Sequence, residues 1–138
     1  MKFSFSHIIS ILLLLFLNSY CTVDDDDDGP YVDPRLKFLG EWSVNNENCS
    51  NNRYVVVISE DPSNSAQVLL FNFGFSQASE PDTAIVTENK IELPKQKNSE
   101  KWEVSGIGNY QDNEEIEWTY SLEISSDLQS CTATYVKQ

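Results

Sequence analysis

The chain has 138 residues, enough for one domain once an N-terminal leader is set aside. It carries 22 acidic against 9 basic residues, a formal net charge of −13, and such a chain repels nucleic acid and anionic lipid head groups. The single histidine, His7, precedes the domain, which excludes histidine-dependent nucleophiles and histidine-containing zinc sites there. We therefore expect no cofactor, no metal and no nucleic-acid partner.

The first 20 residues predict a cleaved export signal. Lys2 supplies the positive start, and residues 8–17 are nearly all apolar. This run fits the hydrophobic part of a signal peptide and is short for a membrane span. A transmembrane anchor is the alternative interpretation.

Cys21 follows this leader directly, after Asn18, Ser19 and Tyr20. A hydrophobic run followed by cysteine resembles the lipobox of bacterial lipoproteins, although Asn18 and Tyr20 depart from its usual leucine and small residue. In that family the cysteine thiol takes a diacylglyceryl group and becomes the first residue of the mature chain. The resemblance implies a membrane anchor on Cys21. The alternative is ordinary cleavage that leaves Cys21 as an unmodified thiol.

A run of acidic residues comes next, namely Asp24, Asp25, Asp26, Asp27 and Asp28. Like charges keep such a segment extended and solvated, so we expect a disordered tether over residues 21–35. The run also resembles the acidic export signal of surface lipoproteins of Bacteroidota, which implies an outer-membrane, surface-exposed location. It lacks the alternating spacing and glycine of a calcium loop. A plain solvated spacer is the alternative.

Residues 36–138 predict eight short strands. Residues 114–124 are the clearest, because Ile116, Trp118 and Tyr120 alternate with polar residues at period two. The expected strands cover 38–44, 53–60, 66–73, 82–88, 90–94, 101–110, 114–124 and 130–137. Consecutive strands with short turns predict an all-β antiparallel meander closed into a barrel, with a β-sandwich as the alternative. Gly106 and Gly108 predict a bend or bulge.

A family resemblance supports the barrel. Gly40 and Trp42 in "FLGEW" resemble the G-x-W opening of lipocalin-like barrels. The order "GEW", "YVVVIS", "NFG", "IELP", "VSGIGNY" and "SCTATYVKQ" resembles small lipocalin-like lipoproteins of Bacteroidota over residues 36–138. That resemblance implies a fold and a location rather than a chemistry.

The two remaining cysteines, Cys49 and Cys131, lie near the first and last expected strands. The first and last strands of an up-and-down barrel are neighbours, and an oxidising compartment favours a bond. We expect a disulfide between them, with two free buried cysteines as the alternative.

Aromatic residues are the main candidates for a binding site. They are Trp42, Phe71, Phe73, Phe75, Trp102, Trp118 and Tyr120. Either they line a pocket for a small apolar ligand, or they fill the core of a module that contacts another envelope protein, because small eight-stranded barrels have just enough room for their own side chains.

Two further patterns concern catalysis and modification. Glu115 and Glu117 resemble a hydrolase carboxylate pair, but they alternate with core residues and should face solvent, so we expect no enzyme. An enzyme of unknown chemistry, such as a carboxylate-based hydrolase, is the alternative. Thr83 in "DTA" resembles the O-glycosylation sequon of secreted Bacteroidota proteins, or is an ordinary strand residue.

Overall fold

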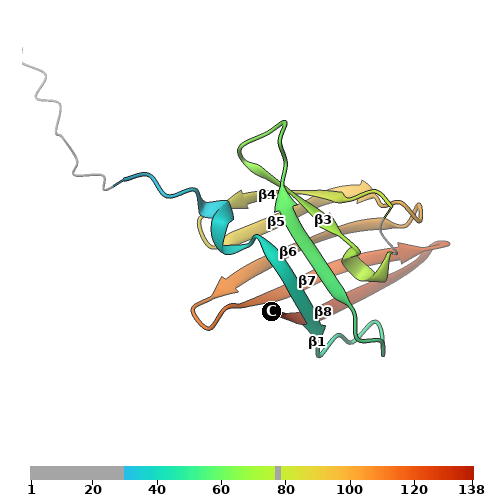
Figure 1. The fold of residues 1–138 in the computed structure, drawn as a ribbon. Coiled ribbons are helices and arrows are strands. Elements are labelled where there is room, and N and C mark those ends of the chain that lie inside the picture. The colour runs from blue at the N-terminus through green and yellow to red at the C-terminus, as the bar shows by residue number, and fades with distance from the viewer. Residues whose placement is uncertain (1–29, 77–78) are drawn as a thin grey trace, which may run out of the picture. The chain divides into compact units, whose positions relative to one another are not determined.

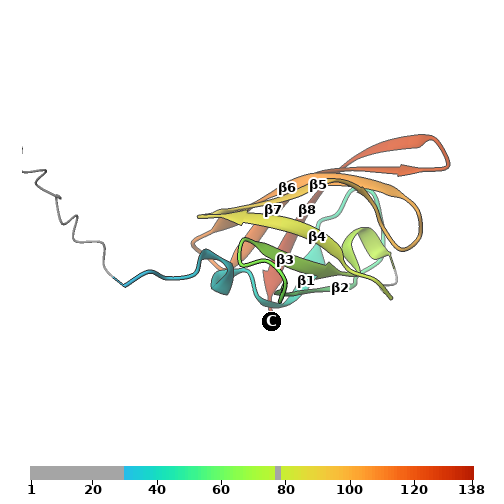
Figure 2. The ribbon, with the colours of Figure 1, turned by 90° about the horizontal axis from the view of Figure 1, so that it is seen from above.

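The computed structural model describes residues 30–76 and 79–138, where eight antiparallel strands follow one another and close into a barrel (Figure 1). The strands are β1 (Gly40–Asn45), β2 (Val55–Glu60), β3 (Gln67–Phe71), β4 (Asp82–Thr87), β5 (Lys90–Lys97), β6 (Glu103–Gln111), β7 (Glu115–Ile124) and β8 (Asp127–Lys137). Because β1 pairs with both β2 and β8, the expected barrel is confirmed and the sandwich is excluded (Figure 2). The expected signal, Cys21 and the acidic run lie outside the described residues.

Strand β7 illustrates how the sequence makes the barrel wall. Ile116, Trp118 and Tyr120 are buried, while Glu117 and Thr119 between them are exposed. Successive side chains of a strand point to opposite faces, so this alternation places one set inside the barrel and the other in solvent.

The glycines of β6 leave room for the large aromatic residues of β7. A Cβ atom on Gly108 would lie 2.7 Å from Trp118, and one on Gly106 would lie 2.4 Å from the Cβ atom of Tyr120. The expected irregularity lies beside Gly106, but its extra residue belongs to β5, between Leu93 and Gln96. A bulge there accommodates a proline, which cannot donate to the strand ladder.

A 3-10 helix, η2 (Pro34–Lys37), lies immediately before the barrel. Asp33 accepts hydrogen bonds from the backbone and side chain of Arg35, and their ion pair measures 2.6 Å. Arg35 is only 8 % exposed. The expectation that a disordered tether extends to residue 35 is therefore wrong at its end, because residues 33–35 are packed into the domain.

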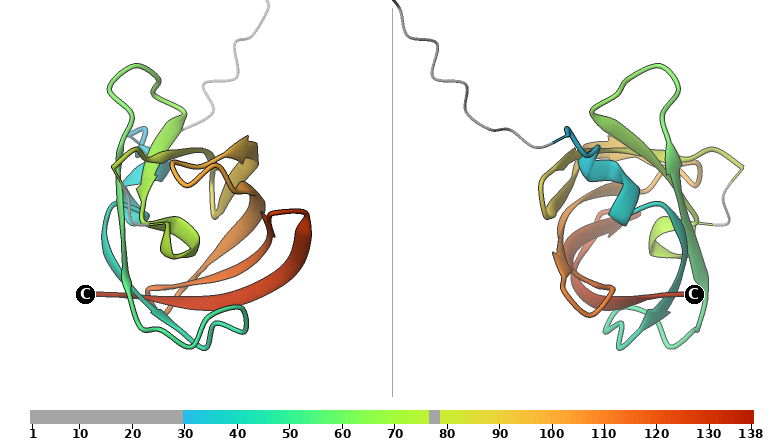
Figure 3. Two further views of the ribbon diagram at one scale, coloured as in Figure 1. Left: turned by 90° about the vertical axis from the view of Figure 1, so that its right-hand side faces the viewer. Right: turned by 60° about the vertical axis from the view of Figure 1, so that its left-hand side comes forward.

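The 3-10 helix η2 lies at one end of the barrel (Figure 3, right). Aromatic and lysine side chains close this end. The indole nitrogen of Trp42 donates to the carbonyl of Phe38 at 2.8 Å, and both side chains are fully buried. The Lys137 ammonium lies 5.5 Å from the ring centre of Trp42, within cation–π range. The G-x-W segment therefore closes one end of the barrel.

A second 3-10 turn, η3 (Phe73–Phe75), lies within the ring of strands at the opposite end (Figure 3, left). The strand expected to reach Phe73 stops at Phe71, because Asn72 turns the chain with a φ of 66°. Phe73 then enters the barrel, with ring centres 4.8 Å from Trp118 and 5.0 Å from Tyr120. No helix among the described residues is both long and apolar enough to cross a bilayer.

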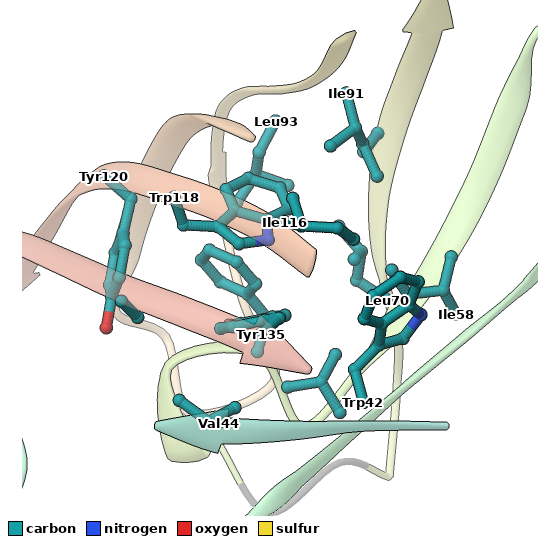
Figure 4. Packing of buried hydrophobic residues seen from close by; sticks show 14 of the residues in the cluster. Trp42, Val44, Ile58, Leu70, Ile91, Leu93, Ile116, Trp118, Tyr120 and Tyr135 are labelled. Carbon is teal, nitrogen blue, oxygen red and sulfur yellow. The ribbon is translucent and has the colours of Figure 1, made fainter. Parts of the chain in front are cut away.

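The barrel interior is filled by its own side chains (Figure 4). Five aromatic residues are less than 2 % exposed: Phe38, Trp42, Phe73, Trp118 and Tyr135. A side chain that lined a cavity large enough for water would retain accessible surface inside it. These residues do not, so the interior is a packed core, as small eight-stranded barrels allow.

Candidate functional site

The mouth of the barrel, meaning the end that contains η3, is bordered by the β1–β2 loop, residues 46–54. Asn48 pairs with β8 as a strand residue would, since its backbone N–H donates to Thr132 and its side-chain oxygen accepts from Thr132 at 2.7 Å. The next residue forms the expected disulfide, with the Cα atoms of Cys49 and Cys131 5.5 Å apart. The disulfide and these hydrogen bonds together extend the contact between β1 and β8 into the loop.

The Glu47 side chain ties this loop to the barrel wall. Its Oε1 atom accepts hydrogen bonds from the hydroxyls of Tyr54, at 2.9 Å, and of Tyr120. Its Oε2 atom is buried and has no hydrogen-bond partner among the described residues. The half-buried carboxylate of Glu47 thus lies beside the mouth, and among the described residues only one of its two oxygens accepts hydrogen bonds.

Three tyrosines surround this carboxylate. Burial raises the pKa values of Tyr54 and Tyr120 far above the ordinary value, and the neighbouring tyrosine and glutamate charges raise them further. Burial likewise raises the pKa of Tyr135, which is fully enclosed. All three therefore stay neutral at physiological pH, so each hydroxyl keeps its proton available for donation.

A second carboxyl faces the interior from β4. Asp82 is 2 % exposed, and burial raises its pKa to about 6.

Thr83, the expected glycosylation site, follows Asp82 on β4 and is half-buried. Its backbone N–H donates to the Gln96 side chain at 3.0 Å, and its C=O accepts from the same side chain at 2.8 Å. The O-glycosylation of Thr83 remains a prediction.

A pocket of about 190 Å³ opens at the mouth. We call it the mouth pocket; it is lined by Glu47, Cys49, Ser50, Gly74, Phe75, Trp102, Leu122, Ile124 and Gln129. Phe75 is 36 % exposed and Trp102 is half-buried, so two aromatic side chains border an opening to solvent. The rest of the lining is mixed, because Leu122 and Ile124 are aliphatic while Glu47, Ser50 and Gln129 are polar or charged.

A larger polar groove of about 540 Å³ lies on the outer side of the same loop. Its lining includes asparagines, Ser50 and Arg53 of the loop, Glu115 and Thr134 of the barrel wall, and Glu47, which therefore borders both this groove and the mouth pocket. Glu117 is exposed and accepts a hydrogen bond from Thr134 at 3.2 Å, but it does not line the groove. The Glu115 and Glu117 side chains thus do not share a cleft. Within residues 30–76 and 79–138, no three metal-ligating side chains are grouped to hold an ion.

The aromatic candidates from the sequence do not form one site. Trp42 closes the far end, and Phe73, Trp118 and Tyr120 belong to the core. Trp102 borders the mouth pocket. The assignment of Phe71 to the pocket or core is wrong: it is only half-buried, lies outside the core cluster and pairs with the exposed Val57.

Sequence analysis missed four residues that shape the mouth. Tyr54 and Tyr135 lie at inward positions next to or within strands, so the period-two pattern could have marked them. Asp82 also lies at an inward position, but a carboxylate at the start of an apolar pattern is normally read as the residue before the strand and not as part of the core. Glu47 gives no local signal, because it lies in an asparagine-rich loop.

Comparison with known proteins found no protein-family model, no curated protein and no solved structure that matches the chain.

Proposed function

We propose that the protein is a lipid-anchored lipoprotein of the cell envelope, displayed on the outer-membrane surface. In this proposal its barrel is a rigid, non-catalytic module that works through its mouth and outer surface, in contact with envelope components. It does not store an apolar ligand in its interior.

The observation that carries this choice is the position of Phe73. Its ring occupies the barrel interior, against Trp118, Tyr120 and Tyr135, where an apolar ligand would otherwise lie. A ligand could enter only if this turn were displaced and the aromatic contacts were lost, each worth about 0.5–1.5 kcal/mol beyond area burial. The packed interior therefore favours the filled-barrel alternative over capture of an apolar molecule.

Support for the location comes from the N-terminal sequence. The apolar run, the following Cys21 and the acidic run have the order of a lipoprotein signal, an anchor site and a surface-export address. A disulfide in the domain fits an exported protein, because such bonds persist in oxidising compartments. The outward Glu117 and the separate Glu115 supply no paired carboxylates for hydrolysis.

The filled interior can be tested with benzene and a long-chain fatty acid as probes. We expect neither probe to raise the melting temperature of the unaltered protein. Phe73→Ala should open a cavity in the interior, and benzene should fill this cavity and raise the melting temperature of the variant. Phe71→Ala, which removes the same side chain from the outer face, is the matched control and should gain no benzene binding. Saturable binding of the fatty acid by the unaltered barrel would contradict the proposal.

The anchor is tested by mass spectrometry of protein purified from membranes. The mature N-terminus should be Cys21 with a diacylglyceryl thioether, and Cys21→Ala should release the protein into the soluble fraction. A Cys21→Ala protein that stays fully in the membrane fraction would show that another segment holds it there.

A further inference from the structure

We propose that the mouth pocket binds a small organic ammonium ion. The ammonium group would lie between the aromatic rings of Phe75 and Trp102, beside the half-buried carboxylate of Glu47. The site belongs to the barrel domain and does not depend on the lipid anchor.

The size and lining of the pocket limit the ligand. Its volume of about 190 Å³ is below the roughly 300–1,000 Å³ of sites for drug-sized molecules, so only a small ligand fits. Leu122, Ile124 and the Cys49 side chain form an apolar wall, while Ser50 and Gln129 offer polar groups at the rim. A compact ligand with an apolar surface and one charged centre matches this lining.

The Glu47 carboxylate determines the sign of that charge. The ion pairs of the described chain are Asp33–Arg35, Lys90–Glu92 and Lys95–Glu103, and none of them includes Glu47. Its Oε1 atom accepts from two tyrosine hydroxyls that stay neutral, and its Oε2 atom is buried with no hydrogen-bond partner in the part of the chain that the structure describes. A half-buried carboxylate that has no ion-pair partner among the described residues would be stabilised by a cation in the adjacent pocket.

The aromatic rings supply a second preference for a cation. The face of an indole or phenyl ring is electron-rich and attracts ammonium groups, above all when water is excluded. Phe75 is held beside the pocket with a φ of 62°, a conformation that is strained for a bulky residue. Its ring meets Tyr54 edge-on at 5.4 Å. Backbone strain of this kind is frequent at ligand sites, where the required position of one side chain outweighs the energetic cost of an unfavourable backbone conformation.

The charge of the whole chain acts in the same direction. A formal net charge of −13 repels anions and raises the local concentration of cations. The pocket is therefore expected to discriminate by charge rather than by shape alone.

Choline and its neutral isostere 3,3-dimethyl-1-butanol test this proposal, because they share a shape and differ in charge. Protein expressed with its full sequence is purified in a nonionic detergent and titrated with each probe by calorimetry. Choline should bind saturably at one site, at least about tenfold more tightly than the alcohol, and more weakly as sodium chloride is raised.

Three variants locate the site. Glu47→Gln keeps the side-chain shape and an oxygen acceptor for the tyrosines, and it should lower choline affinity at least about tenfold. Trp102→Leu should lower it about fivefold through the lost ring face. Glu115→Gln removes the same charge from the outer groove and should change it less than about twofold.

Equal binding of the two probes, or no binding of choline, would overturn the proposal. So would a folded Glu47→Gln protein that binds choline as the unaltered protein does. If Glu47→Gln does not fold, as judged by its melting curve, the comparison of the two probes and the Trp102→Leu variant decide the question.

Discussion

Reduction of the Cys49–Cys131 bond should lower the free energy of unfolding by about 4–5 kcal/mol. The bond joins residues 82 positions apart, and in the chain-entropy model a loop of that length restricts the unfolded chain by this amount. For a domain of about 100 residues, 1 kcal/mol shifts the melting temperature by about 4–8 °C. The expected decrease is therefore roughly 16–40 °C.

The effect should act on the unfolded chain and leave the native structure nearly unchanged. Without the bond, Asn48 still pairs with Thr132 on β8 and Glu47 still accepts from Tyr54 and Tyr120. The loop should therefore stay docked at low temperature, and choline binding at the mouth should survive reduction.

The assay is scanning calorimetry of the Cys21→Ala chain with and without a phosphine reductant, together with near-ultraviolet circular dichroism at 10 °C. Asn48→Ala with the bond intact is the matched control and should lower stability by only about 1–2 kcal/mol. A decrease in melting temperature below about 5 °C on reduction would refute the entropic account. Loss of the near-ultraviolet signal at 10 °C would refute the claim that the native loop holds itself.

Three further perturbations have defined outcomes. Burial raises the pKa of Asp82 to about 6, so between about pH 4 and 6 the folded state keeps a proton that the unfolded state loses. The free energy of unfolding therefore includes a contribution of about 3 kcal/mol from Asp82 below about pH 4, and this contribution is lost as the pH rises to about 6. Asp82→Asn should remove this loss in urea unfolding at each pH, and an unchanged slope between pH 4 and 6 would contradict the assignment. Gly108→Ala should destabilise the barrel by about 1–3 kcal/mol, because its Cβ atom would lie 2.7 Å from Ile91 and Trp118, whereas the outward Ser105→Ala should have little effect on urea unfolding. Replacement of residues 24–28 by serine should leave lipidation intact but lower cleavage by external protease; unchanged cleavage would reduce the run to a spacer.

Local alternation determined the strands. Each of the eight expected ranges contains or overlaps a strand, because the side-chain period of two is set by neighbouring residues alone. Closure and the disulfide also followed from the sequence, since a meander of short strands removes its edges by joining the first strand to the last. The expected strand 66–73 extends two residues too far, and this error also has a local cause. Asn72 adopts the left-handed conformation that ends β3, and the apolar pattern does not reveal it.

Only the tertiary structure decided what the barrel contains and what its mouth offers. Phe71 and Phe73 have the same side chain and are two residues apart, yet one lies on the outer face and the other fills the interior, because the chain turns between them. Glu47 and Tyr120 meet across 73 positions of sequence, because the closure of the barrel brings the β1–β2 loop beside β7. Alternation records which face a residue occupies within its own strand. The partners of a loop carboxylate and the space left beside it depend on how distant strands are brought together, which no local pattern contains.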